Sequence, residues 1–291
     1  MQFLRTPASR AIAALACALA CPAPARAAIT YVQQVRLTSG TEQDQFEVTS
    51  DPFTTPPASG STIIVLAWAY GLGVGAELSV RDSAGNTYAP DVQETVDNGT
   101  GSSFWSAAIF SAPVKAQADG GFTVTVSMPD SGSNPELEAV AMEYSGVGSV
   151  DRTGVGWADS GMPTVRTDQA TRSGTELVEA LTCLFLSGDP FRLDAGPDFA
   201  ERAIQTNNAS HQAGQGVDRI VDAAGVQTAT WTVTPNPGGY LSVIATYFEA
   251  DAGFGPDSLE YRAQTCGCAQ TGWSVPVLLT LLLALGPARR R

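Results

Sequence analysis

FTVTVSM, residues 122–128, alternates apolar and polar side chains without interruption. Positions 122, 124, 126 and 128 are apolar, and the three positions between them are Thr or Ser. Successive side chains of a β-strand point to opposite faces, so a period of two predicts a strand with one buried face and one face in water. This stretch makes an all-β fold the first hypothesis.

Further strand-like segments recur along the chain, separated by Gly, Pro, Ser, Asn and Asp. TIIVLAWAY (62–70) and YLSVIATYF (240–248) are almost continuously apolar, as expected for strands in the core of a sandwich. The other expected strands are 29–37, 45–49, 77–81, 104–110, 137–144, 176–186, 199–205 and 228–233. No segment combines helical periodicity with capping residues, and we find no internal repeat. The sequence therefore predicts an all-β protein with a single antiparallel, jelly-roll-like β-sandwich at 28–250.

The first 27 residues have the pattern of a secretory signal peptide. Arg5 and Arg10 precede the apolar run 11–20, and Ala25-x-Ala27 supplies a small-residue cleavage site. A lipoprotein signal is the alternative, because Cys21 follows Ala-Leu-Ala, although a bulkier aliphatic residue is usual three positions before that cysteine.

The other end of the chain predicts retention at a membrane. The apolar run 273–285 would form a short hydrophobic helix of roughly 20 Å, against about 30 Å of bilayer hydrocarbon. Arg289, Arg290 and Arg291 follow it and would stay on the cytoplasmic side. With the arginines in the cytoplasm, the body at 28–250 is expected on the other side of the membrane. Residues 251–265 lack strand alternation and are expected to be a stalk between the body and the membrane.

Residues 266–291 resemble the Myxo-CTERM sorting signal of myxobacterial surface proteins. The resemblance rests on Cys266-Gly267-Cys268, the apolar run and the terminal arginines, while Gly286-Pro287 departs from the pattern. It implies removal of the tail by a sorting protease and anchoring at the cell surface, or outer membrane, near Cys266 or Cys268. An ordinary membrane anchor with free thiols is the alternative.

The body carries a weaker resemblance to uncharacterised β-sandwich modules of bacterial extracellular proteins. It rests on GSTIIVLAWAYG, SVRDSAGNTY, SSFWSAAIF and VAMEYSGV, with an echo at GGYLSVIATYFEA. These are mainly core strands and turns, so the resemblance implies fold and exterior location, and it transfers no functional residue.

The net negative charge of the body limits the classes of partner that it can bind. All 29 acidic residues and ten of the 16 basic residues lie between positions 28 and 262, a net charge of −19 against −13 for the whole chain. Such a surface repels phosphate backbones, so nucleic acid is not an expected partner. Clustered carboxylates could hold calcium, but no calcium-binding motif is present, and Asp82 is expected in a tight turn. No cofactor is predicted.

Few residues carry the pattern of a catalytic site. His211 is the only histidine and lies in a polar loop sequence, and no G-x-S-x-G motif occurs. A multi-histidine zinc site is therefore excluded. Cys183, the body's one cysteine, is flanked by Leu and is expected to be a buried apolar side chain. Glu138/Glu143 and Glu176/Glu179 are each predicted on opposite faces of a strand, which separates their carboxylates.

Aromatic residues give the one candidate ligand site. Trp68, Trp105 and Trp231 fall in expected strands and are assigned to the core. Trp157 lies in the glycine-rich GVGWADSGMP, expected to be a loop, with Asp159 two residues on. We interpret Trp157 and Asp159 as the candidate contacts for a ligand.

These observations together favour a secreted, surface-anchored binding or adhesion module without catalysis, with an extracellular polysaccharide or another surface protein as partner. Two other functions stay open. A secreted glycosidase needs only two suitably spaced carboxylates, and a structural envelope or coat component needs no pocket.

Overall fold

The computed structural model describes residues 28–38, 46–72, 77–97, 103–115, 121–129, 133–172, 175–185, 192–207, 212–235 and 237–250. All regular secondary structure in these residues is β-strand, and every strand pairing is antiparallel. The prediction of an all-β antiparallel fold is confirmed. No helix capable of crossing a membrane occurs within these ranges.

The strands fall into two runs of eight. The N-terminal half contains β1 (Thr30–Thr38), β2 (Glu47–Thr49), β3 (Thr62–Leu72), β4 (Ser79–Asp82), β5 (Ala89–Asp97), β6 (Ser103–Pro113), β7 (Val124–Ser127) and β8 (Ser133–Ser145). The C-terminal half contains β9 (Val147–Ala158), β10 (Thr164–Arg166), β11 (Glu176–Phe185), β12 (Arg192–Ala195), β13 (Ala200–Asn207), β14 (Gln212–Val221), β15 (Thr228–Thr234) and β16 (Gly239–Glu249).

The two halves have the same topology. The N-terminal half forms a five-stranded sheet, β1-β8-β3-β6-β5, and a three-stranded sheet, β2-β7-β4. The C-terminal half forms β9-β16-β11-β14-β13 and β10-β15-β12. Adding eight to each strand number of the first pair of sheets gives the second pair. The chain is thus a structural tandem repeat, which the sequence analysis did not detect.

Irregularities in the sheets repeat as well. The edge strand β1 bulges at Val32, and its counterpart β9 bulges at Asp151. The opposite edge strand β5 bulges at Asp91, and its counterpart β13 bulges at Arg202. Bulges bend a strand and fix its register, so their recurrence at matching positions supports equivalence of the two halves residue by residue.

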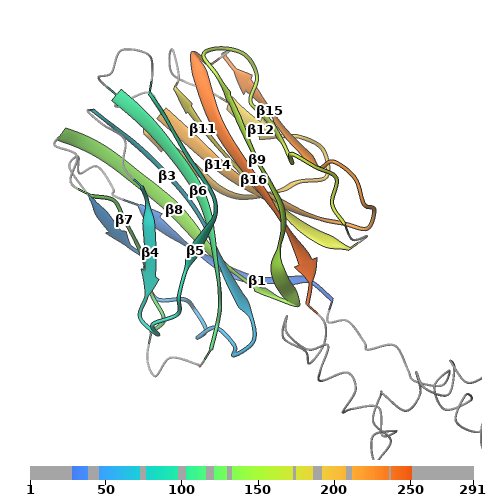
Figure 1. Cartoon of the computed structure of the whole chain (residues 1–291). Helices are drawn as coiled ribbons and strands as arrows, with labels where there is room; N and C mark the ends of the chain where they lie inside the picture. Colours follow the sequence, from blue (N-terminus) through green and yellow to red (C-terminus); the bar gives the residue numbers. More distant parts are fainter. Residues whose placement is uncertain are drawn as a thin grey trace, which may run out of the picture. The chain divides into compact units, whose positions relative to one another are not determined.

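The four sheets stack in layers, with the two five-stranded sheets in the middle and a three-stranded sheet on each outer side (Figure 1). Three apolar clusters fill the spaces between them. Phe110 and Phe122 belong to the cluster of the N-terminal half, and Trp231 belongs to that of the C-terminal half. Leu66 and Leu241 lie in the central cluster, where the two halves meet. The result is a sandwich-like body with an apolar cluster in each space between neighbouring sheets.

Polar contacts cross the central layer at equivalent places. Tyr144 of β8 donates its hydroxyl to Oδ2 of Asp218 at 2.6 Å, and Tyr247 of β16 donates to Oδ2 of Asp91 at 2.7 Å. Tyr144 is opposite Tyr31, which precedes the bulge of edge strand β1, and Tyr247 is opposite Val150, which precedes the bulge of edge strand β9. The two tyrosines therefore occupy equivalent positions in the repeat. Each bond joins one half to the other.

Asp218 has a second partner that neutralises it. Arg202 donates from Nε to Oδ1 at 2.7 Å and from Nη2 to Oδ2 at 2.8 Å, and its guanidinium lies 3.8 Å from the ring centroid of Tyr31. The Asp218 side chain is only 4% exposed. A buried carboxylate is tolerated because it is paired and fully hydrogen-bonded.

We therefore predict that Arg202→Ala lowers the free energy of unfolding by about 3–5 kcal/mol, because it leaves the buried Asp218 charge without a cation. Urea denaturation at neutral pH measures this loss. The matched control is Arg192→Ala, which breaks an exposed pair with Asp194 and should cost no more than about 1 kcal/mol. Equal losses in the two variants would contradict the assignment.

Candidate ligand-binding groove

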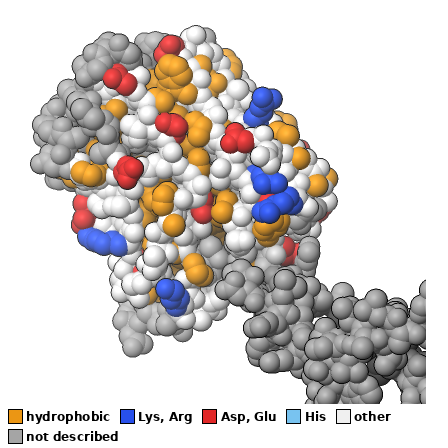
Figure 2. Space-filling model, viewed as in Figure 1, with side chains coloured by type: hydrophobic (Ala, Val, Ile, Leu, Met, Phe, Trp, Pro, Cys, Tyr) orange, Lys and Arg blue, Asp and Glu red, His pale blue; other side chains and the backbone are white. Residues whose placement is uncertain are grey.

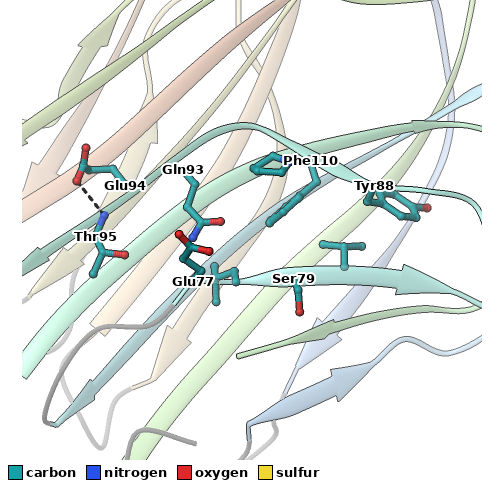
Figure 3. Close-up of a pocket in the computed structure, with 10 residues that line it drawn as sticks. Glu77, Ser79, Tyr88, Gln93, Glu94, Thr95 and Phe110 are labelled. Carbon is teal, nitrogen blue, oxygen red and sulfur yellow. Dashed lines mark hydrogen bonds between the residues drawn. The ribbon is translucent and has the colours of Figure 1, made fainter. Parts of the chain in front are cut away.

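A cavity of about 500 Å³ opens along the side of the N-terminal half, between β4 and β5 (Figure 3). These two strands are the edges of the three-stranded and five-stranded sheets, respectively. The lining residues are Glu77, Leu78, Ser79, Val80, Tyr88, Pro90, Gln93, Glu94, Thr95 and Phe110. The groove therefore lies at the margin of the N-terminal half, between the edge strands of its two sheets.

The connection between β4 and β5 is a turn fixed by Asp82. Oδ1 of Asp82 accepts the backbone N–H groups of Ala84 and Asn86 at 2.9 and 3.1 Å, and Gly85 has a φ of 74°, which favours glycine. Oδ2 accepts from the Asn86 side chain at 2.8 Å and from the Tyr88 hydroxyl at 2.9 Å. Asp82 thus acts as the predicted turn residue, and it also orients Tyr88.

The groove has an apolar base. Phe110 of β6 and Leu78 are buried, while Val80 and Tyr88 are half-buried against the same cluster. The Tyr88 hydroxyl is held by Asp82, and burial, together with the Asp82 charge, raises the pKa of this phenol. Tyr88 is therefore neutral and fixed, so what it offers a ligand is its ring.

Polar groups line the rim. Gln93 points across the groove toward Glu77, which precedes β4 (Figure 3). Thr95 is hydrogen-bonded to Ser106 Oγ at 2.8 Å, and its backbone N–H donates to Oε1 of Glu94 at 3.0 Å. An apolar base with amide, hydroxyl and carboxylate groups at the rim suits a polyhydroxylated ligand, which presents apolar C–H faces and polar edges.

The residues singled out from the sequence, Trp157 and Asp159, do not line this groove. Trp157 lies in strand β9, so its placement in a loop was wrong. It pairs with Leu241 of β16 and is 43% exposed, and Asp159 follows the end of the strand. Apolar side chains reach the surface in a broken line on the face shown in Figure 2, with acidic side chains among them.

The strand at Trp157 was misread because of its glycines. A Cβ at Gly154 would collide with the carbonyl oxygen of Arg166, and one at Gly156 would collide with that of Thr164. Glycine is needed here because β10 packs directly on β9, and it does not indicate a loop.

Other expectations about single residues hold. Trp68 and Trp231 are buried, and Trp105 is half-buried against the central cluster, as predicted for core aromatics. Cys183 is buried and free, and burial raises the pKa of its thiol to about 12, which agrees with an inert apolar role. Outside the described residues lie Ala27, Cys21, His211, Cys266, Cys268 and Arg289–Arg291.

Glu138 and Glu143 face opposite sides of β8, as predicted. Glu143 is structural, because its carboxylate accepts from Ser61 Oγ at 2.7 Å and Gln33 Nε2 at 2.6 Å. Glu138 lies on the other face with Glu136, two residues away. Burial, with the adjacent Glu136 charge, raises the pKa of Glu138 to about 8. The sequence analysis missed this same-face pair, although the E-x-E spacing was visible.

Glu179 is the most deeply buried acid of the central layer. Its side chain lies between the two five-stranded sheets with no solvent exposure, and the nearby Tyr144 hydroxyl donates to Asp218 at 2.6 Å. Burial raises the pKa of Glu179 well above its ordinary value, and the Asp218 charge raises it further, against the lowering effect of Arg202. Burial therefore favours the protonated, uncharged form of this carboxyl in the folded protein.

Within the described ranges, no group of three or more His, Cys, Asp or Glu side chains is placed to hold a metal ion. Comparison with protein-family models, with curated proteins and with solved structures finds no match for the chain. The interpretation of the groove therefore depends on its own geometry and chemistry.

The Glu179 carboxyl generates a prediction about pH. Its folded-state pKa is raised, so the folded protein keeps a proton that the unfolded chain has released, and stability must fall as pH rises above the unfolded pKa. We expect the Glu179 contribution to the free energy of unfolding to decline by about 1.4 kcal/mol per pH unit between its unfolded-state pKa and its raised folded-state pKa. Glu179→Gln should flatten the decline, as measured by urea denaturation at a series of pH values. An unchanged slope in Glu179→Gln would contradict the raised pKa.

Proposed function

We propose that this protein is a non-catalytic binding or adhesion module that holds a polysaccharide chain in the groove between β4 and β5. The observation that carries the proposal is the groove itself, a cavity of about 500 Å³ with an aromatic and aliphatic base and a rim of Gln, Glu, Ser and Thr. A saccharide ring stacks its C–H face on apolar surface and directs its hydroxyls to such polar groups.

The scaffold suits this role. We propose that each half is a jelly roll, because strands one, eight, three and six lie side by side in one sheet and two, seven and four in the other. Sites built on strands of a packed scaffold are held more rigidly than sites on loops. The groove lies on two edge strands of such a scaffold, so it is preformed for its ligand.

We also propose that the body is exported and kept at the cell surface. The support lies in the order of segments in the sequence: a signal-peptide pattern at 1–27, a tail at 266–291 with two cysteines, an apolar run and three arginines, and a strongly acidic body between. Polysaccharides of a matrix or of another cell are accessible from that location.

The groove assignment predicts that Gln93→Ala weakens glycan binding five- to tenfold, about 1–1.4 kcal/mol, through loss of rim hydrogen bonds. Glycan arrays with the full chain identify a ligand, and titration calorimetry then measures affinity. Gln169→Ala, at an exposed glutamine of the C-terminal half, is the matched control and should bind normally. Binding lost in Trp157→Ala but kept in Gln93→Ala would place the site on β9 instead.

A glycosidase is the second candidate, and Glu138 is the observation that favours it. With a pKa of about 8, this acid keeps its proton at neutral pH, as a general acid must, and Glu136 stands on the same face. Release of reducing ends from glycans by the full chain tests this function. Hydrolysis that is abolished in Glu138→Gln and retained in Gln93→Ala would establish an enzyme, and no hydrolysis by the unaltered chain would exclude one acting on those glycans.

A further inference from the structure

The charges at the groove are all of one sign. Glu77 and Glu94 line it, and no Lys or Arg does. Neither carboxylate is paired with a basic side chain of the described residues. The adjoining sequences GVGA (73–76) and NGTGS (98–102) contain no basic residue either. The Glu77 carboxylate therefore faces Gln93 across the groove with no cation of the described residues to neutralise it, while the Glu94 side chain points away from Gln93 at the margin (Figure 3).

The strands around the groove add to its negative electrostatic potential. Residues 62–113, which contain β3 to β6, hold five acidic residues and one basic residue, Arg81. The Arg81 guanidinium is bound to Oε1 of Glu47 on β2 at 2.8 Å. Because concave sites focus the potential of their charges, a cation entering this groove is stabilised and an anion is repelled.

The repeat supplies an internal comparison. Phe199 of the C-terminal half is equivalent to Tyr88, since both precede the edge strand by one residue. Arg219 occupies the position equivalent to Ala112, and its guanidinium lies 4.5 Å from the Phe199 ring centroid. At the corresponding place, the C-terminal half thus supplies its own cation over the aromatic ring, whereas the N-terminal half has only an alanine methyl group.

We propose that the groove selects polysaccharides that carry free amino groups, such as polymers of 2-amino sugars, over neutral and acidic ones. This inference rests on the proposed glycan-binding function of the groove. The sugar ring packs on Tyr88 and Pro90, the hydroxyls reach Gln93 and Thr95, and the ammonium group is held by Glu77. Charge-assisted hydrogen bonds to this carboxylate supply the preference.

Three oligosaccharides of equal length test the preference by calorimetry at mildly acidic pH and low salt: a glucosamine oligomer, its N-acetylated form and a uronic acid oligomer. We expect the glucosamine oligomer to bind at least tenfold more tightly than the N-acetylated form, and the uronic acid oligomer to bind least. Added salt should narrow the difference. Glu77→Gln should reduce the preference several-fold, and Glu94→Gln should reduce it less, because the Glu94 side chain points away from Gln93 (Figure 3).

The control is Glu201→Gln, which removes an exposed carboxylate at the β13 position equivalent to Pro90 and should leave the preference unchanged. Equal binding of the glucosamine and N-acetylated oligomers would overturn the selectivity and leave the glycan-binding function standing. Binding of none of the three would overturn both. An oligolysine peptide that binds as tightly as the glucosamine oligomer would assign the site to a basic protein partner instead.

Discussion

The structure depends on burying two five-stranded sheets against each other. Each of these sheets packs on its own three-stranded sheet with one face and on the other half with the second face, so its central strands have no side in water. In β3, Ile63 and Val65 enter the cluster of the N-terminal half, while Ile64 and Leu66 enter the central one. Two-sided burial requires the continuously apolar sequences seen in β3 and β16.

Polar groups in the central layer have unequal roles. The Tyr144–Asp218 and Tyr247–Asp91 bonds join the halves at equivalent points, and only one alignment of the sheets satisfies both. Such directional contacts add less net stability than apolar packing, but they select a single register from the many that two flat apolar faces would allow. Glu179 is fully buried in the same layer and has no basic side chain of the described residues paired with it, so its burial is a cost that the apolar contacts must offset.

Alternation and apolar runs were sufficient to predict the fold class and eleven of the strands, because those strands bury one or both faces with large side chains. The strands β5, β9, β10, β12 and β14 were missed. In β14, Gly214 and Gly216 make room for Trp68 and Leu66 of the other half, so glycine marks close packing rather than a turn. The repeat was hidden because equivalent residues differ in chemistry, as with Asp91 and Arg202. The groove was not predictable, since β4 and β5 are consecutive in the chain but belong to different sheets, and only the tertiary fold determines the space between them.

The comparison of the two halves separates scaffold from function. What repeats is the strand order, the bulges and the tyrosines that join the halves, all of which determine packing. What differs is the margin beside β5 and β13, where the Arg219 guanidinium lies over the Phe199 ring and the position equivalent to Arg219 in the N-terminal half is Ala112. A fold constrains core positions and leaves edge positions free to vary, so the two copies can keep one architecture while one of them acquires a site. Since the shared features account for stability, the divergent margin is where selection for a ligand would act.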